Sequence, residues 1–198
     1  MAMNPCRVVV GVTGASGAGI ALRIIERLAD MKNVEIHLVL SQSAKRTLLH
    51  EEGAQAMGRM FSLTSFNHAI DDIGAAIASG SFPTAGMIVA PCSMRTLAAI
   101  ATGFSDNLLT RAADVHLKER RKLVLMTRET PLHLIHLRNM CTVTEAGAIV
   151  MPPVPAFYNR PQSVDDIVDQ LAARAIDQLG IASAPQAPIW QPHMVKAP

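Results

Sequence analysis

The chain alternates between short, continuous runs of apolar residues and longer segments in which apolar residues recur at helical spacing. Runs without polar alternation are typical of strands that are buried on both faces of a parallel sheet. Most of these runs are closed by serine, proline or glycine, which favour turns. This pattern predicts strands over Val8–Thr13, Val34–Ser41, Met87–Ala90, Leu123–Met126 and Ile149–Met151.

Helical spacing follows these strands and predicts an alternating strand and helix order. The predicted helices cover Ile20–Leu28, Ala44–Glu52, Thr96–Thr102, Asp106–Arg120, His133–Glu145 and Val164–Leu179. In the less regular middle part, Phe61–Phe66 is predicted as a short strand and Ile70–Ile77 as a helix. The alternation predicts a single-domain, Rossmann-like, doubly wound parallel α/β sheet over residues 1–181. A proline-rich tail is predicted over 182–198.

A glycine-rich turn lies between the first predicted strand and helix, with Gly14, Gly17 and Gly19 around Ser16. A strand followed by such a turn and a helix N-terminus is a geometry that cradles phosphate, because free backbone N–H groups point at the anion. The spacing is neither the GxGxxG of dinucleotide folds nor a P-loop. It therefore predicts a nucleotide or another phosphate ligand, and the alternative is a tight turn whose glycines only allow close packing.

Polar residues follow most of the predicted strands. Ligands of doubly wound sheets bind beyond the carboxyl ends of the strands, so we expect these residues on one rim. The rim is rich in hydroxyl groups and comprises Ser16, Ser41, Ser43, Ser93, Arg95, Thr96, Arg128, Glu129 and Tyr158. No histidine joins a serine and an acid there, so the pattern does not predict a hydrolytic triad. Cys92, which follows a proline at a strand end, is interpreted as a packing residue.

Composition narrows the class of protein. Hydrophobic residues make up 49% of the 198 residues and charged residues only 17%, so we expect subunits of a homo-oligomer to cover part of the surface. A net charge of +2 gives no reason to expect nucleic acid. No apolar run approaches the ~20 residues of a membrane span. The N-terminus lacks the pattern of a signal peptide, so no membrane association is expected.

The cysteines and histidines give no metal pattern. Cys6, Cys92 and Cys141 form no C-x-x-C motif and are interpreted as free thiols in a reducing cytoplasm. His133 and His136 are three residues apart on a predicted helix, but no cysteine or acid completes a known zinc spacing. The sequence therefore predicts a cytoplasmic protein without a bound metal.

Several motifs, taken in order, are specific enough to indicate a family. They are GVTGASG, LVLSQSA, PCSMRTLAAIATG, DNLLTRAADVHLKERRKLVL, RETPLHLIHLRNM and PPVPAFYNRPQSVDDIV. From about Arg7 to Ile181 the chain resembles the flavin prenyltransferases, the UbiX-like group. The stretch from Phe66 and His68 to Gly80-Ser81-Phe82 resembles the branch that is encoded beside phenolic-acid decarboxylases. The resemblance implies an FMN-binding flavoprotein fold and a homododecamer.

The resemblance also implies an activity. Members of the family attach a dimethylallyl group from dimethylallyl phosphate to N5 and C6 of reduced FMN. The product, prenylated FMN, is used by UbiD-type decarboxylases, which makes such a decarboxylase the expected recipient. The chemistry agrees with the residues, since cations and an acid can neutralise a leaving phosphate without metal. The acidic pair Asp71-Asp72 is not a DDxxD motif.

Carried over to this sequence, the family's contacts fall into three groups. FMN would be held by Gly14, Ala15, Ser16, Ser41, Ser93, Met94, Arg95, Thr96 and Arg128. The prenyl donor would be held by a neighbour's Arg111 and by Lys118, Arg128, Glu129, Tyr158, Arg174 and Trp190. The residues expected to take part in catalysis are Ser16 and Glu51, which would move protons during ring closure, with Lys118 beside the phosphate and Glu129 as the acid.

Other functions remain open from the residues alone. The first is an FMN-dependent cysteinyl decarboxylase, a group on the same scaffold that carries a PASANT-like strand end where this chain has PCSMRT. The second is a non-catalytic FMN-binding accessory subunit of an aromatic-acid decarboxylase, since carrying and making a flavin use the same pocket.

Overall fold

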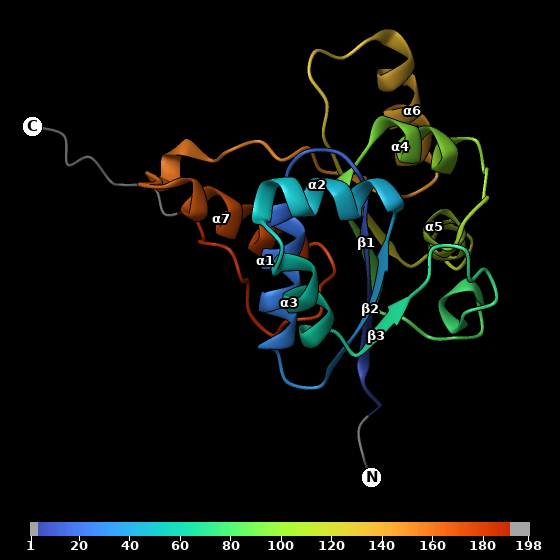
Figure 1. Ribbon diagram of the computed structural model, residues 1–198. Coiled ribbons are helices and arrows are strands. Elements are labelled where there is room, and N and C mark those ends of the chain that lie inside the picture. Colours follow the sequence, from blue (N-terminus) through green and yellow to red (C-terminus); the bar gives the residue numbers. More distant parts are fainter. Residues whose placement is uncertain (1–3, 191–198) are drawn as a thin grey trace, which may run out of the picture.

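The computed structural model describes residues 4–190, which form a six-stranded parallel sheet between two layers of helices (Figure 1). The spatial order of the strands is β3-β2-β1-β4-β5-β6, which is the order of the Rossmann fold. The predicted doubly wound parallel sheet is thus confirmed. The strands are β1 (Cys6–Val12), β2 (Val34–Leu40), β3 (Phe66–His68), β4 (Gly86–Cys92), β5 (Lys122–Thr127) and β6 (Ile149–Val150).

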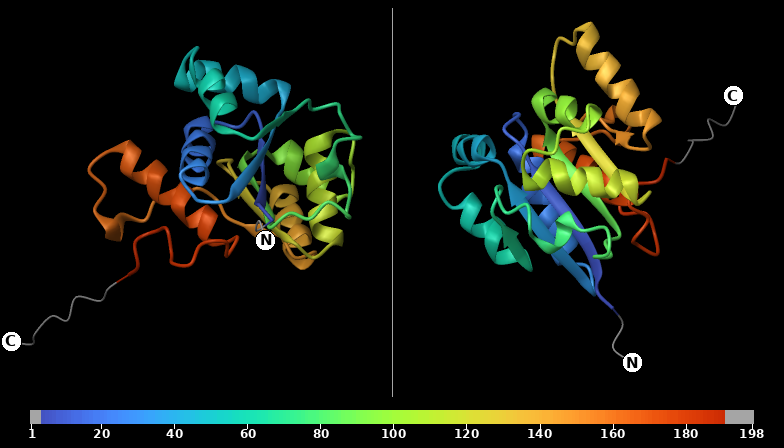
Figure 2. Two further views of the ribbon diagram at one scale, coloured as in Figure 1. Left: turned by 90° about the horizontal axis from the view of Figure 1, so that it is seen from below. Right: turned by 90° about the vertical axis from the view of Figure 1, so that its right-hand side faces the viewer.

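Helices cover both faces of the sheet, as the view from below shows (Figure 2). One layer contains α1 (Ala18–Ala29), α2 (Gln42–Glu52), α3 (Ala56–Leu63) and α7 (Val164–Asp177). The other layer contains α4 (Met94–Ala101), α5 (Leu108–Lys118) and α6 (Leu134–Glu145). Short 3-10 turns lie at η1 (Ala76–Ala78) and η2 (Phe157–Asn159).

The core is divided by the sheet, because side chains alternate between its faces. In β1, Val8, Val10 and Val12 pack with α1 and α7, whereas Val9 packs with the layer that contains α5. All of these valines are fully buried, which explains why the sequence shows continuous apolar runs without alternation.

Two predicted elements between β2 and β4 are wrong. Phe61–Phe66 is not a strand, because α3 continues to Leu63 and places Met60 against the core, and β3 begins only at Phe66. Ile70–Ile77 is not a helix but a series of turns that ends in η1. Aspartate and glycine within that segment are poor helix formers, and tertiary packing of Ile77 in the core overrides its apolar spacing.

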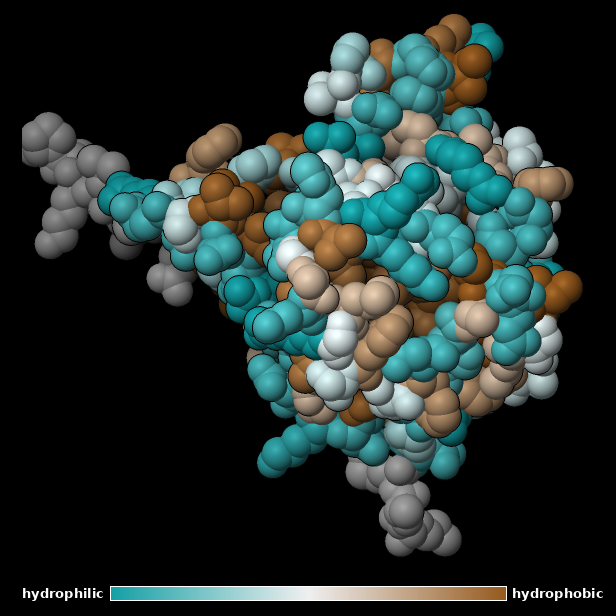
Figure 3. All heavy atoms as spheres, viewed as in Figure 1, coloured by the Kyte–Doolittle hydropathy of each residue, from teal (hydrophilic) through white to brown (hydrophobic). Residues whose placement is uncertain are grey.

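Some apolar side chains lie on the surface. They include Leu134, Ile135 and Leu137 on α6, together with Val154 and Phe157 on the segment of residues 152–163, here called the arm. Figure 3 shows hydrophobic patches on α6 and on the arm. Within residues 4–190, no helix is both long enough and apolar enough to cross a membrane.

His116 is a buried titratable group on α5. Its Nδ1 lies 2.7 Å from the carbonyl oxygen of Ala112, which can only accept, so Nδ1 carries the proton of the neutral ring. The Nε2 atom then accepts a hydrogen bond from the Thr84 hydroxyl at 2.9 Å. Burial lowers the pKa of His116 from 6.5 to about 4.

We expect the free energy of unfolding to fall as the pH drops from 6.5 towards 4. In this range the unfolded chain binds a proton at His116 and the folded chain does not, so stability is complete above pH 6.5 and is lost below it. The slope should be about 1 kcal/mol per pH unit. Denaturant unfolding between pH 7.5 and 5 measures it, and His116→Gln is the control. Equal slopes in both proteins would contradict the prediction.

Candidate functional site

A pocket opens at the carboxyl edge of the sheet, the rim, where the ends of β1, β2 and β4 meet. It has a volume of about 510 Å³ and is lined by Thr13, Gly14, Ser41, Ser43, Ile70, Ser93, Arg95, Thr96 and Asn107. The chain leaves β1 towards β2 on one side and β4 lies on the other side, so this is the topological switch point of the sheet. Ligands of doubly wound folds bind at this point. We call this cavity the rim pocket.

The N-termini of three helices border the rim pocket. Ser41 caps α2 by accepting from the Ala44 N–H at 3.0 Å, and Ser93 caps α4 by accepting from the Thr96 N–H at 3.3 Å. Asn107 caps α5 in the same way. Because each helix N-terminus carries a partial positive charge, the pocket suits an anion such as a phosphate group.

The N-terminus of α1, which the glycine-rich turn predicts as the phosphate cradle, is occupied by a side chain of the protein. Oε2 of Glu51 accepts hydrogen bonds from the backbone N–H groups of Gly17 at 2.9 Å and Ala18 at 2.8 Å. The carboxylate therefore takes the position that a phosphate takes in dinucleotide folds. A phosphate at this site is instead expected at α2, α4 and α5.

Glu51 is held as an anion. Burial acts to raise its pKa, but hydrogen bonds from Ser16, Ala18 and Gly17 and the charge of Arg128 outweigh burial, so the pKa of Glu51 lies below its ordinary value. The structure thus brings together Ser16, Glu51 and Arg128, which come from the ends of β1, α2 and β5. A carboxylate beside a hydroxyl can accept a proton through that hydroxyl.

Two residues after β1 explain the close packing of the turn. A Cβ atom on Gly14 would lie 2.3 Å from Cβ of Ser43, so only glycine fits between the turn and α2. The Thr13 hydroxyl donates to the Pro91 carbonyl at 2.6 Å and accepts from the Ser93 N–H at 2.9 Å, which fastens the ends of β1 and β4 together. Close packing against α2 is therefore one reason for a glycine at position 14.

Arg95 and Arg128 differ in their surroundings. Arg95 lies at the mouth of the rim pocket, where Asp106 accepts from its guanidinium at 2.6 Å. Arg128 follows β5, and its backbone N–H donates to the Cys92 carbonyl at 3.1 Å. Glu129 is exposed beside it and accepts from the Thr130 N–H at 3.0 Å.

Cys92 is fully buried at the end of β4. Burial raises the pKa of its thiol to about 12, so the thiolate is not formed near neutral pH. The interpretation of Cys92 as a packing residue is confirmed.

The cations of α5 do not reach the rim pocket within one chain. Lys118 follows Asn107 by eleven residues, which is roughly 16 Å along the helix, and it pairs with Glu119. Arg111 pairs with Asp114 at 2.6 Å and donates to the Ala78 carbonyl at 3.3 Å. The predicted grouping of Lys118 with Glu129 is therefore not formed within a single chain, and Arg111 was predicted to come from a neighbour.

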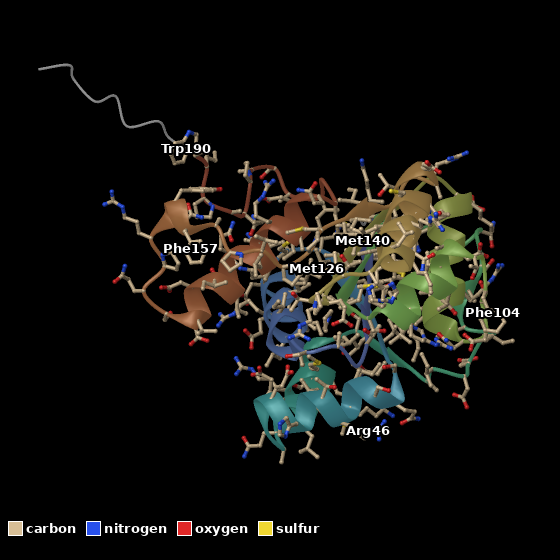
Figure 4. The ribbon with its side chains drawn as sticks, turned by 90° about the horizontal axis from the view of Figure 1, so that it is seen from above. Arg46, Phe104, Met126, Met140, Phe157 and Trp190 are labelled. Atoms are coloured by element: carbon tan, nitrogen blue, oxygen red, sulfur yellow. The ribbon has the colours of Figure 1, made fainter. Side chains whose placement is uncertain are left out.

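The late residues of the predicted site lie on the arm, on α7 and after α7, and Tyr158, which was predicted on the rim, lies on the arm. The rings of Tyr158 and Trp190 meet edge to face with centroids 5.1 Å apart, and Arg174 lies 3.7 Å from Asp177. Figure 4 shows Trp190 and the neighbouring Phe157 together at one end of the molecule, away from the sheet. None of these side chains lines the rim pocket.

Sequence reasoning missed Thr13, Ile70 and Asn107 as lining residues. The signal for Asn107 was present, since asparagine before an apolar helix is typical of an N-cap. Thr13 and Ile70 carry no local signal, because their place in the pocket depends on contacts with β4 and α5.

The fold and the rim pocket define a single-sheet α/β protein with an anion site at its switch point. The sequence profile of the Flavoprotein family matches residues 2–176. A protein of Thauera aromatica named flavin prenyltransferase UbiX is 55% identical over 175 residues, which cover 88% of this chain and 89% of that protein. The chain therefore belongs to the flavin prenyltransferases of the Flavoprotein family, and it is an enzyme of that class.

Solved structures support this family assignment. A crystal structure of the UbiX protein PadA1 with FMN and dimethylallyl pyrophosphate has a TM-score of 0.88 and 46% identity, covering 95% of this chain and 98% of that one. A dodecameric FMN-dependent UbiX-like decarboxylase from Escherichia coli O157:H7 has a TM-score of 0.89 and 49% identity, covering 94% and 100%. The FMN-dependent cysteine decarboxylase TvaF shares the fold alone, at 14% identity and a TM-score of 0.63.

Gly14→Ala should lower the free energy of unfolding by about 1–3 kcal/mol, which is typical of overpacking. The added methyl group collides with Ser43 and must push the turn away from α2, so the affinity for FMN should fall as well. Denaturant unfolding and FMN titration measure both effects. Gly58→Ala is the matched control, because nothing lies within 4 Å of its Cβ position. Similar stability of the Gly14 and Gly58 variants would contradict the steric argument.

Proposed function

We propose that this protein transfers the dimethylallyl group of dimethylallyl phosphate to N5 and C6 of reduced FMN. The prenylated FMN would serve a UbiD-type decarboxylase in the cytoplasm. The observation that carries the proposal is the rim pocket at the switch point, next to the paired Ser16 and Glu51. A relative of 46% identity was solved with FMN and dimethylallyl pyrophosphate, which supports both ligands.

The residues of the rim pocket fit FMN. Three helix N-termini and the Arg95 guanidinium suit its phosphate, and the serine and threonine hydroxyls suit a polyhydroxy chain. In this proposal Gly14, Ala15, Ser16, Ser41, Ser93, Met94, Arg95, Thr96 and Arg128 hold the FMN. The reduced flavin supplies the nucleophilic N5 and C6 atoms.

Ser16 and Glu51 act on protons in the proposed reaction. Because hydrogen bonds and Arg128 keep the pKa of Glu51 low, its carboxylate is ready to accept. Closing the ring at C6 would break the C6–H bond and saturate the prenyl double bond. The Ser16 hydroxyl would pass the proton that leaves C6 to an oxygen of Glu51, and the same pair would return a proton to the alkene carbon that is not bonded to C6. The N–H groups of Gly17 and Ala18 fix that carboxylate in place.

Arg128 and Glu129 act on the leaving phosphate. Both follow β5 on the rim, where a cation and an acid can neutralise the phosphate as the allylic bond breaks. Glu129 donates a proton to the phosphate oxygen. In the proposed site, Lys118 and Arg111 supply further positive charge.

The proposed site needs neighbouring copies of the chain. The residues that hold the donor in this proposal include Lys118 and Arg111 on α5, Tyr158 on the arm and Arg174 on α7. None of them lines the rim pocket of its own chain. Exposed apolar side chains on α6 and the arm are suited to contacts between copies. The related protein from Escherichia coli O157:H7 is described as dodecameric, and we propose a homododecamer here as well.

Incubation of the purified chain with reduced FMN and a prenyl donor, without a decarboxylase, tests the proposal. Mass spectrometry of the released flavin should show one added dimethylallyl group when dimethylallyl phosphate is present. A parallel reaction with the pyrophosphate identifies the donor. Bound FMN that leaves unchanged with both donors would indicate a carrier and overturn the proposal.

Glu129→Gln should lower the rate of prenylation by at least ~100-fold, the lower end of general acid catalysis. Glutamine keeps the shape and the hydrogen-bonding reach of the side chain but cannot donate the proton. FMN binding should remain, because the rim pocket is unchanged. Glu145→Gln, an exposed acid at the end of α6, is the control for the loss of one negative charge. A Glu129 variant within a few-fold of the parent rate would leave Glu129 only an orienting role.

A further inference from the structure

The chain turns back after α7 and runs along that helix. Asp177, at the last position of α7, accepts hydrogen bonds from the backbone N–H groups of Gln186 at 2.6 Å and Ala187 at 3.1 Å. Ala187 is buried as a result. The side chain of Asp177 is only 9% exposed, so its bonds are shielded from water. We call residues 182–190 the strap.

The far end of the strap meets the arm. Pro188 lines a cavity of about 200 Å³ together with Ala156 and Asn159 of the arm and Gln170 of α7. Trp190 then places its ring edge-on against Tyr158, with centroids 5.1 Å apart. The strap therefore connects the last turn of α7 to the arm. Figure 4 shows Trp190 and Phe157 at the same end of the molecule.

The strap and its anchor touch two residues that the proposed function assigns to the prenyl donor. Asp177, which binds the middle of the strap, pairs with Arg174 at 3.7 Å, and Trp190 at the end of the strap packs on Tyr158. A hollow of about 310 Å³ in front of Arg174 is walled by strap residues 182–185. The strap thus bounds the space in which the Arg174 guanidinium can meet an anion.

We propose that Asp177 is a positioning residue, which holds the strap closed and thereby sets the geometry of Arg174 and Tyr158 for the donor. The inference rests on the proposed function, since that function gives both residues their ligand. Asp177 itself is not placed against the donor. Its carboxylate acts through the strap backbone and through the Arg174 side chain, whose conformational freedom it reduces.

Fluorescence of the full-length protein tests whether Asp177 holds the strap against the arm, because Trp190 and Tyr158 are the only tryptophan and tyrosine in the chain. At 5.1 Å between the rings, excitation of Tyr158 passes to Trp190 in the parent protein. Asp177→Asn removes the charge that holds two N–H groups and Arg174. We expect tyrosine emission to appear in this variant as the strap separates from the arm.

Steady-state kinetics test whether the closed strap is needed for binding of the prenyl donor. Because Asp177→Asn weakens the hydrogen bonds of a charged group to the strap, it should raise the KM for dimethylallyl phosphate about 10-fold or more. We expect kcat to stay within a few-fold and FMN affinity to stay unchanged. Trp190→Ala should also raise the KM for dimethylallyl phosphate. Trp190→Phe, which keeps an aromatic ring against Tyr158, should have a KM between those of the parent and Trp190→Ala. The double variant Asp177→Asn/Trp190→Ala should have a KM no higher than that of the single variant with the larger effect, because both substitutions release the same strap.

Glu35→Gln is the control for the loss of one paired carboxylate. Glu35 lies on β2, and its partners Arg7 at 2.7 Å and His37 at 3.0 Å lie outside the strap and the arm. It should leave the energy transfer and the KM close to the parent values. Unchanged energy transfer in Asp177→Asn, or equal changes in the Glu35 variant, would overturn the inference. If the parent protein makes no prenylated FMN, the proposed function fails, while energy transfer still decides whether Asp177 holds the strap.

Discussion

The carboxylate of Glu51 on the N-terminus of α1 is the interaction on which the arrangement of the site depends. It satisfies the N–H groups of Gly17 and Ala18 and so removes the usual phosphate position of a dinucleotide fold. The positive ends of α2, α4 and α5 remain for a phosphate at the rim pocket. The same carboxylate stays charged beside Ser16, where the proposed function uses it as a proton acceptor.

The charged residues of the predicted site lie partly on the rim and partly elsewhere in the chain. Arg128 and Glu129 lie on the rim itself, next to the end of β4. Lys118 lies at the far end of α5, and Arg174 lies on α7 near the strap. Within one chain, Lys118 and Arg174 therefore do not line the rim pocket. Exposed apolar side chains on α6 and the arm are suited to contacts between copies, and the proposed function uses such contacts to complete the site.

Prediction from the sequence succeeded where local signals were strong. The central strands could be predicted because β1, β2 and β4 are buried on both faces and therefore appear as continuous apolar runs. Ser41 and Ser93 could be predicted because a serine after a strand both lines the rim and caps a helix. The segment 70–77 failed, since packing of Ile77 against the core, and not helix propensity, decides its path. Thr13 was missed because its partners lie in β4, far along the chain.

The sequence by itself determined the parallel α/β class, the rim positions of Ser41, Ser43, Ser93, Arg95 and Thr96, and the family, because apolar runs, turn residues and contiguous motifs are local properties of the chain. The tertiary structure alone decided that Glu51 and not a phosphate occupies the α1 N-terminus, that Lys118 lies away from the rim, and that Asp177 binds the strap. These features depend on contacts between residues distant along the chain. Such contacts are set by the packing of helices on the sheet, which no local pattern records.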